Sequence, residues 1–96
     1  MLTGKQKRYL RGLGHDLKAV VLIGKSEITD TLLQETDAAL ERHELIKVKL
    51  LENSLTDRRE AAADLAVNLK ADVAQILGRT FLLYRPSREP KIMLPR

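Results

Sequence analysis

The sequence predicts an α/β fold of the two-layer α+β type, with three helices and a mixed four-stranded sheet in the order αβαβαββ. Three segments repeat apolar residues at helical spacing, and four shorter segments are apolar or alternate between apolar and polar residues. The last two of these are joined by Gly78 and Arg79, a two-residue link that suits a type II′ hairpin. We expect one domain of 96 residues, in which residues 85–96 form an irregular basic tail with three prolines.

Candidate caps and apolar spacing set the bounds of the predicted helices, which span residues 4–12, 30–42 and 57–70. Thr3 is the candidate N-cap of the first helix, and Ser54 and Thr56 are the candidates for the third. The apolar stripe of the first helix consists of Tyr9, Leu10 and Leu13. We expect the other sides of this helix to carry its lysines and arginines.

Alternation and apolar runs set the bounds of the predicted strands, which span residues 20–23, 44–50, 73–77 and 80–84. In the second strand, Ile46 and Val48 share one face. Lys47 and Lys49 lie on the other, so this side of the sheet is expected to be partly wet. Strands separated by helices are expected to pair in parallel through right-handed crossovers, whereas the last two pair antiparallel. The first helix or the segment 92–94 is expected to cover part of the second sheet face.

Charge is segregated along the chain, although the net charge is only +4. Residues 1–25 hold six Lys/Arg and one acidic residue, and residues 77–96 hold five and one. Residues 26–76 hold six basic residues against eleven acidic ones. A fold that brings both ends together would show a basic region on one side. The alternative is that the charged ends simply stay in solvent and favour solubility.

The segment from Val20 to Thr31 is typical of a strand that feeds a helix through a short loop. Gly24, Lys25 and Ser26 belong to this loop. At such a junction, the free backbone N–H groups and the dipole of the following helix attract an anion such as phosphate. The alternative is that Gly24 only turns the chain and that Thr29 only caps the helix.

The sequence lacks the patterns of catalytic and metal-binding proteins. It has no cysteine, and His15 and His43 lie on different predicted elements without the spacing of a metal site. We therefore expect no enzymatic activity, no metal and no other cofactor. No apolar run is long enough for a membrane span, and the first residues do not resemble a signal peptide. We expect a cytoplasmic protein without membrane contact.

Residues along nearly the whole chain resemble a known family. The most specific runs are His43 to Lys49, which reads HELIKVK, and Leu83 to Pro86, which reads LYRP. Further matches are Gln6-Lys7, Leu10-Arg11, Leu13, His15, Leu17-Lys18, Val20-Val21, Ile23-Gly24-Lys25, Thr29, Ala39-Leu40 and Ile76-Leu77-Gly78. The chain resembles the bacterial YhbY proteins, stand-alone versions of the CRM domain, which is named for chloroplast RNA splicing and ribosome maturation. The resemblance implies the fold of the C-terminal domain of translation initiation factor three, and RNA binding on precursors of the large ribosomal subunit.

The loop departs from the family pattern at one position. The family reads GxxG there, as in KH domains, whereas this chain has Glu27 in place of the second glycine. A carboxylate beside a phosphate site repels its ligand, although it favours the dipole of the following helix. The cations outside the loop therefore receive more weight. The candidate RNA-binding residues are Lys7, Arg8, Arg11, Lys18, Gly24, Lys25, Ser26, Arg79 and Arg85.

The expected partners are ribosomal RNA and the particles that precede the large subunit. The sequence favours a monomer and leaves dimerisation open. Only three aromatic residues are present, so RNA would be recognised by its backbone and shape rather than by stacking. Two other classes of function stay open. A protein-interaction module would use the acidic second helix or the tail, and a small DNA-binding domain would bind duplex DNA as well as RNA.

Overall fold

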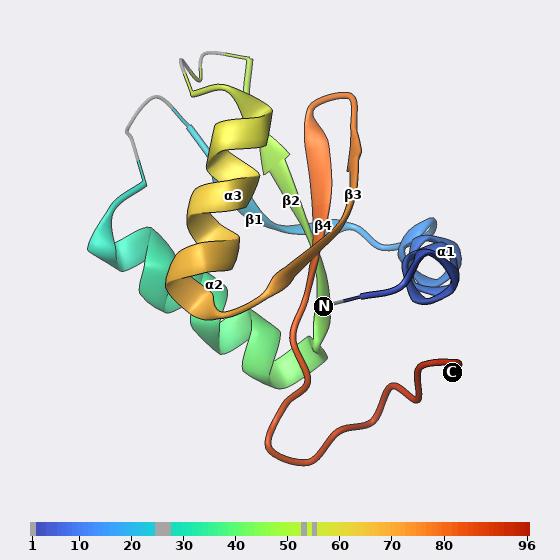
Figure 1. The fold of residues 1–96 in the computed structure, drawn as a ribbon. Helices are drawn as coiled ribbons and strands as arrows, with labels where there is room; N and C mark the ends of the chain where they lie inside the picture. Colours follow the sequence, from blue (N-terminus) through green and yellow to red (C-terminus); the bar gives the residue numbers. More distant parts are fainter. Residues whose placement is uncertain (1, 25–27, 53, 55) are drawn as a thin grey trace.

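The computed structural model describes residues 2–24, 28–52, 54 and 56–96, and Figure 1 shows how they fold. The helices are α1 (Gly4–Gly14), α2 (Asp30–His43) and α3 (Arg58–Leu69). The strands are β1 (Ala19–Ile23), β2 (Leu45–Leu50), β3 (Asp72–Leu77) and β4 (Thr80–Tyr84). Within the described residues the order is αβαβαββ, which confirms the predicted α+β class with three helices and a mixed four-stranded sheet.

The strands form one mixed sheet in the spatial order β1-β2-β4-β3. β1 pairs with β2 in parallel, and β4 pairs antiparallel with both β2 and β3. The expectation that β2 and β3 pair in parallel is wrong, because β4 lies between them. β4 suits this interior position because both of its faces are apolar and buried. Asp72 and Gln75 give β3 the more polar character of an edge strand.

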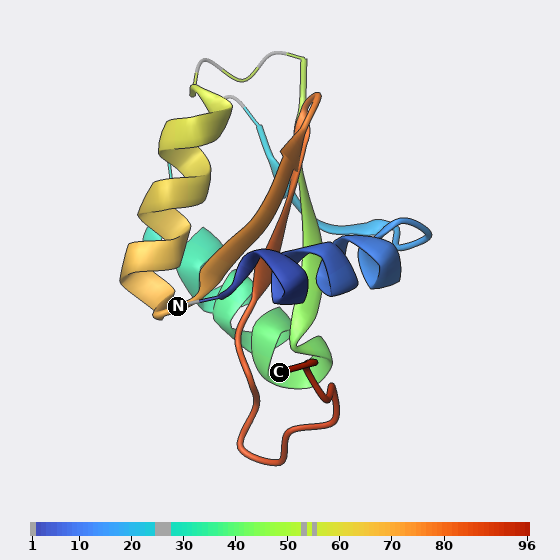
Figure 2. The same cartoon turned by 45° about the vertical axis from the view of Figure 1, so that its right-hand side comes forward.

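Apolar side chains hold helices to both faces of the sheet, so the fold has three layers rather than the predicted two. α2 and α3 cover one face, where they pack against core residues such as Phe81 (Figure 1). α1 crosses the other face, as Figure 2 shows, and Leu10 lies there in one cluster with Leu82. Ile92 and Leu94 of the tail pack against the same cluster. The expectation that the first helix or the tail covers the second face is therefore confirmed for both segments.

The second sheet face stays partly uncovered on the β1 side. Val20 and Leu22 of this strand are 47% and 51% exposed. Tyr9 and Leu13, which belong to the predicted apolar stripe of α1, are each 42% exposed, whereas Leu10 is fully buried. α1 therefore rests on the sheet along a narrower stripe than its apolar residues predict.

Side-chain caps set where the helices begin. Thr3 and Thr29 cap α1 and α2, and each hydroxyl accepts a backbone N–H from the first turn at 3.1 Å. Asp57 caps α3, so the expectation that Ser54 or Thr56 does so is wrong. The Asp57 carboxylate accepts two N–H groups of the first turn and complements the helix dipole, which a hydroxyl does less well.

Two glycines near the end of α1 have different surroundings. A methyl group added at Gly14 would lie 2.5 Å from Leu82 Cδ1, whereas one added at Gly12 would meet nothing within 4 Å. We expect Gly12→Ala to raise the free energy of unfolding by about 0.5–1 kcal/mol through helix propensity. Gly14→Ala should lower it by about 1–2 kcal/mol, since the buried Leu82 must shift. Urea unfolding of both variants measures these effects, and equal values would contradict the close packing at Gly14.

Candidate nucleic-acid interface

Lys47 and Lys49 of β2 lie on the sheet face opposite α2 and α3. They alternate with Val48, which is fully buried in the core beneath these helices. Lys47 is half-buried and pairs in register with Leu82, whereas Lys49 is exposed and pairs with Thr80. Both lysines therefore belong to the surface on the α1 side of the sheet.

A groove of about 530 Å³ separates part of α1 from the sheet. Arg8, Arg11 and His15 line it from the α1 side, and Lys47 and Thr80 line it from the sheet. The charged residues among its described lining are all basic. Cations on both walls reinforce one another's potential and attract the phosphates of a nucleic-acid backbone.

Two further exposed cations lie near the α1 wall of this groove in the sequence, although they are not among the residues that line it. Lys7 is exposed on α1, and its spacing from Arg8 and Arg11 places all three on neighbouring positions of the helix surface. Lys18, which is also exposed, lies in the connection from α1 to β1. Among the described residues, no carboxylate forms a salt bridge with these four side chains. Their positive charge is therefore not neutralised by a described neighbour.

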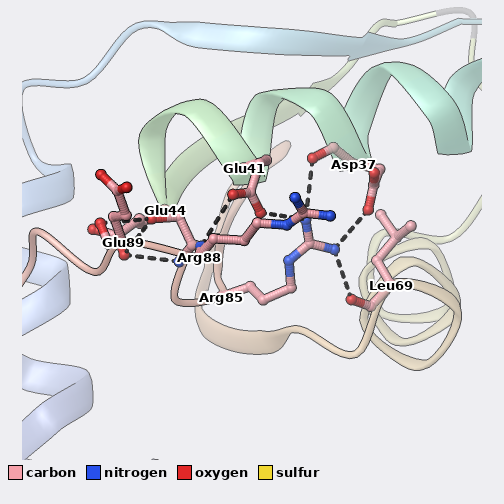
Figure 3. A network of polar contacts seen from close by, with 8 residues as sticks. Asp37, Glu41, Glu44, Leu69, Arg85, Arg88 and Glu89 are labelled. Carbon is pink, nitrogen blue, oxygen red and sulfur yellow. Dashed lines mark hydrogen bonds and ion pairs between the residues drawn. The ribbon is translucent and has the colours of Figure 1, made fainter.

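Glu44, at the joint between α2 and β2, anchors the tail. Its buried carboxylate accepts the backbone N–H groups of Ser87, Lys91 and Ile92 at 2.8 to 2.9 Å. Burial raises the pKa of this carboxyl, but these donors and the Ser87 hydroxyl outweigh burial and hold the pKa below its ordinary value. Glu44 lies at one end of the polar network in Figure 3. The tail is thereby directed back to the second sheet face, where Ile92 packs.

Comparison with known proteins identifies the family. A sequence model of the CRS1 / YhbY (CRM) domain matches residues 2–85. The chain belongs to the CRM family. Membership of this family, which the runs at residues 43–49 and 83–86 indicated, is therefore confirmed over nearly the whole chain.

Two bacterial relatives of this CRM domain align over almost its full length. "Probable RNA-binding protein YqeI" of Bacillus subtilis is 41% identical over 96 residues, which cover 99% of this chain and 100% of the relative. An "RNA-binding protein" of Haemophilus influenzae is 41% identical over 95 residues, which cover 99% of this chain and 96% of the relative. A Staphylococcus aureus protein solved in solution shares the fold with a TM-score of 0.84 and 43% identity, covering 99% of this chain and 100% of that one.

The GxxG-like loop of this CRM domain lies mostly outside the described residues. Lys25, Ser26 and Glu27 fall there, so their contact with phosphate stays a prediction. Gly24 is described and half-buried, and a methyl group added to it would approach Leu51 Cδ1 at an ordinary distance of 3.8 Å. Packing against the described residues therefore tolerates a side chain at this position.

Arg79 holds the β3–β4 hairpin of the CRM domain to the end of β2. Its guanidinium donates to the carbonyl oxygens of Leu50 and Leu51 at 3.2 and 2.6 Å. The predicted type II′ turn requires a positive φ at its first central residue and a negative φ at its second. Gly78 has a φ of 59°, and Arg79 does not have a positive φ, so both residues meet this requirement. Arg79 lines a different hollow from Arg8, so its contact with RNA stays a prediction.

Arg85 joins α2, α3 and the start of the tail (Figure 3). Its guanidinium donates to Asp37 Oδ1 at 2.7 Å and to the carbonyl oxygens of Asp37 and Leu69 at 3.2 and 3.0 Å. A carboxylate oxygen of Glu41 lies 3.9 Å away, and the Arg85 side chain is only 18% exposed. These partners lie on the α2 and α3 side of the sheet. We therefore expect Arg85 to stabilise the CRM fold rather than to contact RNA.

The candidate residues named from the sequence of this CRM domain do not include Lys47 and Lys49. A signal was present, because alternating lysines on a strand indicate a solvated sheet face. The value of that signal depends on where α1 crosses the sheet and on which part it leaves open. Packing between segments that are distant in the sequence determines the position of α1, so the local pattern of β2 does not predict which lysines border the groove.

Proposed function

We propose that this CRM domain binds ribosomal RNA and acts on precursors of the large ribosomal subunit. The contact surface, here named the basic face, consists of Lys7, Arg8, Arg11, Lys18, Lys47 and Lys49. The observation that carries the proposal is the groove between α1 and the sheet, whose charged described residues are all basic. The names of the two relatives support RNA as the ligand class. The link to the large subunit rests on the resemblance to the YhbY proteins.

The basic face suits contacts with phosphates better than contacts with base edges. Its cations end in ammonium or guanidinium groups near the surface, and Phe81 and Tyr84 of the neighbouring strand are buried. Stacking of several bases along this sheet would need exposed aromatic side chains. Because phosphate contacts carry little sequence information, we propose that RNA shape sets the preference of the domain.

The acidic side of α2 is less suited to a protein-interaction module. Asp37 and Glu41 both lie beside Arg85, and Glu41 also accepts the backbone N–H of Arg88 at 3.0 Å (Figure 3). These carboxylates therefore make contacts within the protein. The proposal for RNA rests on cations that have no such described partners.

The activity we propose is binding, without a cofactor or a reaction. Among the residues that the structure describes, no group of three His, Cys, Asp or Glu side chains is placed to hold a metal ion. In the same part of the chain, no helix combines the length and apolar character that crossing a membrane requires. The relatives are named for RNA binding, which agrees with a binding role.

A salt titration of binding tests this proposal. The probes are a fragment of large-subunit ribosomal RNA and a duplex DNA that carries the same number of phosphates. We expect the logarithm of RNA affinity to fall with the logarithm of salt by roughly 0.7–0.9 per phosphate neutralised. Tighter binding of RNA than of DNA at each salt concentration supports the proposal. Equal binding of both probes would favour a DNA-binding domain, and an affinity that hardly changes with salt would contradict an electrostatic interface.

A further inference from the structure

An apolar hollow of about 400 Å³ lies on the other side of α1, next to the start of β2 and the tail. Its apolar walls come from Leu13, Leu17, Val20 and Ile92. Leu13, Leu17 and Val20 keep 42%, 37% and 47% of their surface exposed. Removal of these apolar side chains from water by a ligand is favourable, so this hollow is a candidate binding site.

Two cations line the same hollow and connect it to the basic face. Lys18 and Lys47 both border it, and Lys47 also lines the groove beside Arg8 and Arg11. The described residues that line the hollow include no carboxylate. The charge pattern is therefore complementary to a ligand that carries negative charge next to a flat apolar group. A nucleotide has this combination.

We propose that the hollow receives one unpaired nucleobase of an RNA whose backbone lies along the basic face. The inference rests on the proposed function and names the RNA feature that the site selects. The backbone would pass from the groove across Lys47 toward Lys18, and the base would enter between Leu17 and Val20. A bulged or looped base suits this site because it is already unpaired, so little stacking and pairing energy is lost when it turns out of the helix.

Three RNA hairpins of identical stem sequence test the proposal. One is fully paired, one carries a single bulged adenosine, and one carries an abasic nucleotide at the bulge. The abasic hairpin keeps the phosphates and the bulge and lacks only the base. We expect the adenosine bulge to bind about fivefold tighter than the abasic bulge, a factor that corresponds to about 40 Å² of apolar surface removed from water.

Variants of the exposed wall show whether the base enters this hollow. Leu17→Gln and Val20→Gln should each reduce the difference between the adenosine and abasic hairpins to less than about twofold, because a polar wall binds the base less well. Both positions are partly exposed, so we expect the variants to fold. Val67→Gln is the matched control, since Val67 is 79% exposed on α3, and it should keep the difference.

The outcomes separate this inference from the proposed function. If the wild-type protein binds all three hairpins equally, the hollow does not select a base, and the basic face remains as the RNA site. If the preference for adenosine persists in both wall variants, the base is bound elsewhere and the inference is overturned. If no hairpin and no ribosomal RNA fragment binds, the proposed function and this inference both fail.

Discussion

Glu44→Gln is expected to lower the free energy of unfolding by about 3 kcal/mol. The carboxylate is buried and accepts three backbone N–H groups and one hydroxyl, all from the tail. Glutamine removes the charge and places an NH₂ group among donors, so some of these N–H groups lose their acceptor. Urea unfolding followed by circular dichroism measures the loss.

Glu41→Gln is the matched control for this variant. Glu41 lies one turn earlier in the chain, and its side chain is 46% exposed. Its removal should lower the free energy of unfolding by less than about 1 kcal/mol, as is usual for exposed carboxylates. Similar losses in Glu44→Gln and Glu41→Gln would contradict a special role for the buried anchor.

The contribution of Glu44 should also depend on pH. Burial raises its pKa, but the donors of the tail outweigh burial, so the pKa in the folded protein lies below the ordinary value of the unfolded chain. The stabilisation is therefore complete above the unfolded-state pKa and is lost as the pH falls through the folded-state pKa. The difference in unfolding free energy between the wild type and Glu44→Gln should be largest near neutral pH and should shrink in acid. A difference that stays constant on acidification would argue against an ionised anchor.

Neutralising Arg8, Arg11 and Lys47 together, each to Gln, should weaken binding of the ribosomal RNA fragment roughly 100-fold at about 0.1 M salt. Each cation that contacts a phosphate releases a counterion on binding, so the salt slope should also become shallower by roughly 2–3. The loss should be similar for RNAs of different sequence, because these contacts read the backbone. Fluorescence anisotropy across a salt series measures both quantities.

The control for this triple variant changes the net charge by the same amount on other elements. Arg42, Arg59 and Lys70 are exposed and belong to α2, α3 and the cap of α3. Their replacement by Gln should weaken binding much less than the loss of the three groove cations. Equal losses in the two triple variants would show that net charge, and not the groove, determines affinity.

Local sequence patterns predicted the elements of this fold because neighbouring residues set them. Alternation placed Ile46 and Val48 beneath the helices and Lys47 on the opposite face, as the structure shows. Thr3 caps the start of α1, as its side chain predicts. The position of β4 between β2 and β3 is a different matter. This position depends on which strand is polar enough for the edge of the sheet. The more polar β3 takes the edge and the apolar β4 takes the interior, and this becomes clear only when the two strands are compared with each other.

The candidate site was harder to predict because basic residues differ in their partners. Arg85 and Lys47 are both basic in the sequence, yet Arg85 is held by Asp37 and Leu69, which lie 48 and 16 positions away. Lys47 lines the groove together with Arg8 and Arg11 of α1. Arg85 and Lys47 therefore differ in their contacts with distant segments of the chain. Composition and local spacing do not reveal such contacts.

The contacts of α1 with residues 82–95, far along the chain, set an order of events during synthesis. Leu10 belongs to a cluster that contains Leu82 and against which Leu94 packs, and the Gln6 side chain donates to the carbonyl oxygen of Pro95 at 3.0 Å. The full set of packing partners of α1 is therefore available only after synthesis has passed residue 95. Until then, a nascent chain carries the cations of α1 without the complete groove that we propose as the RNA-binding surface.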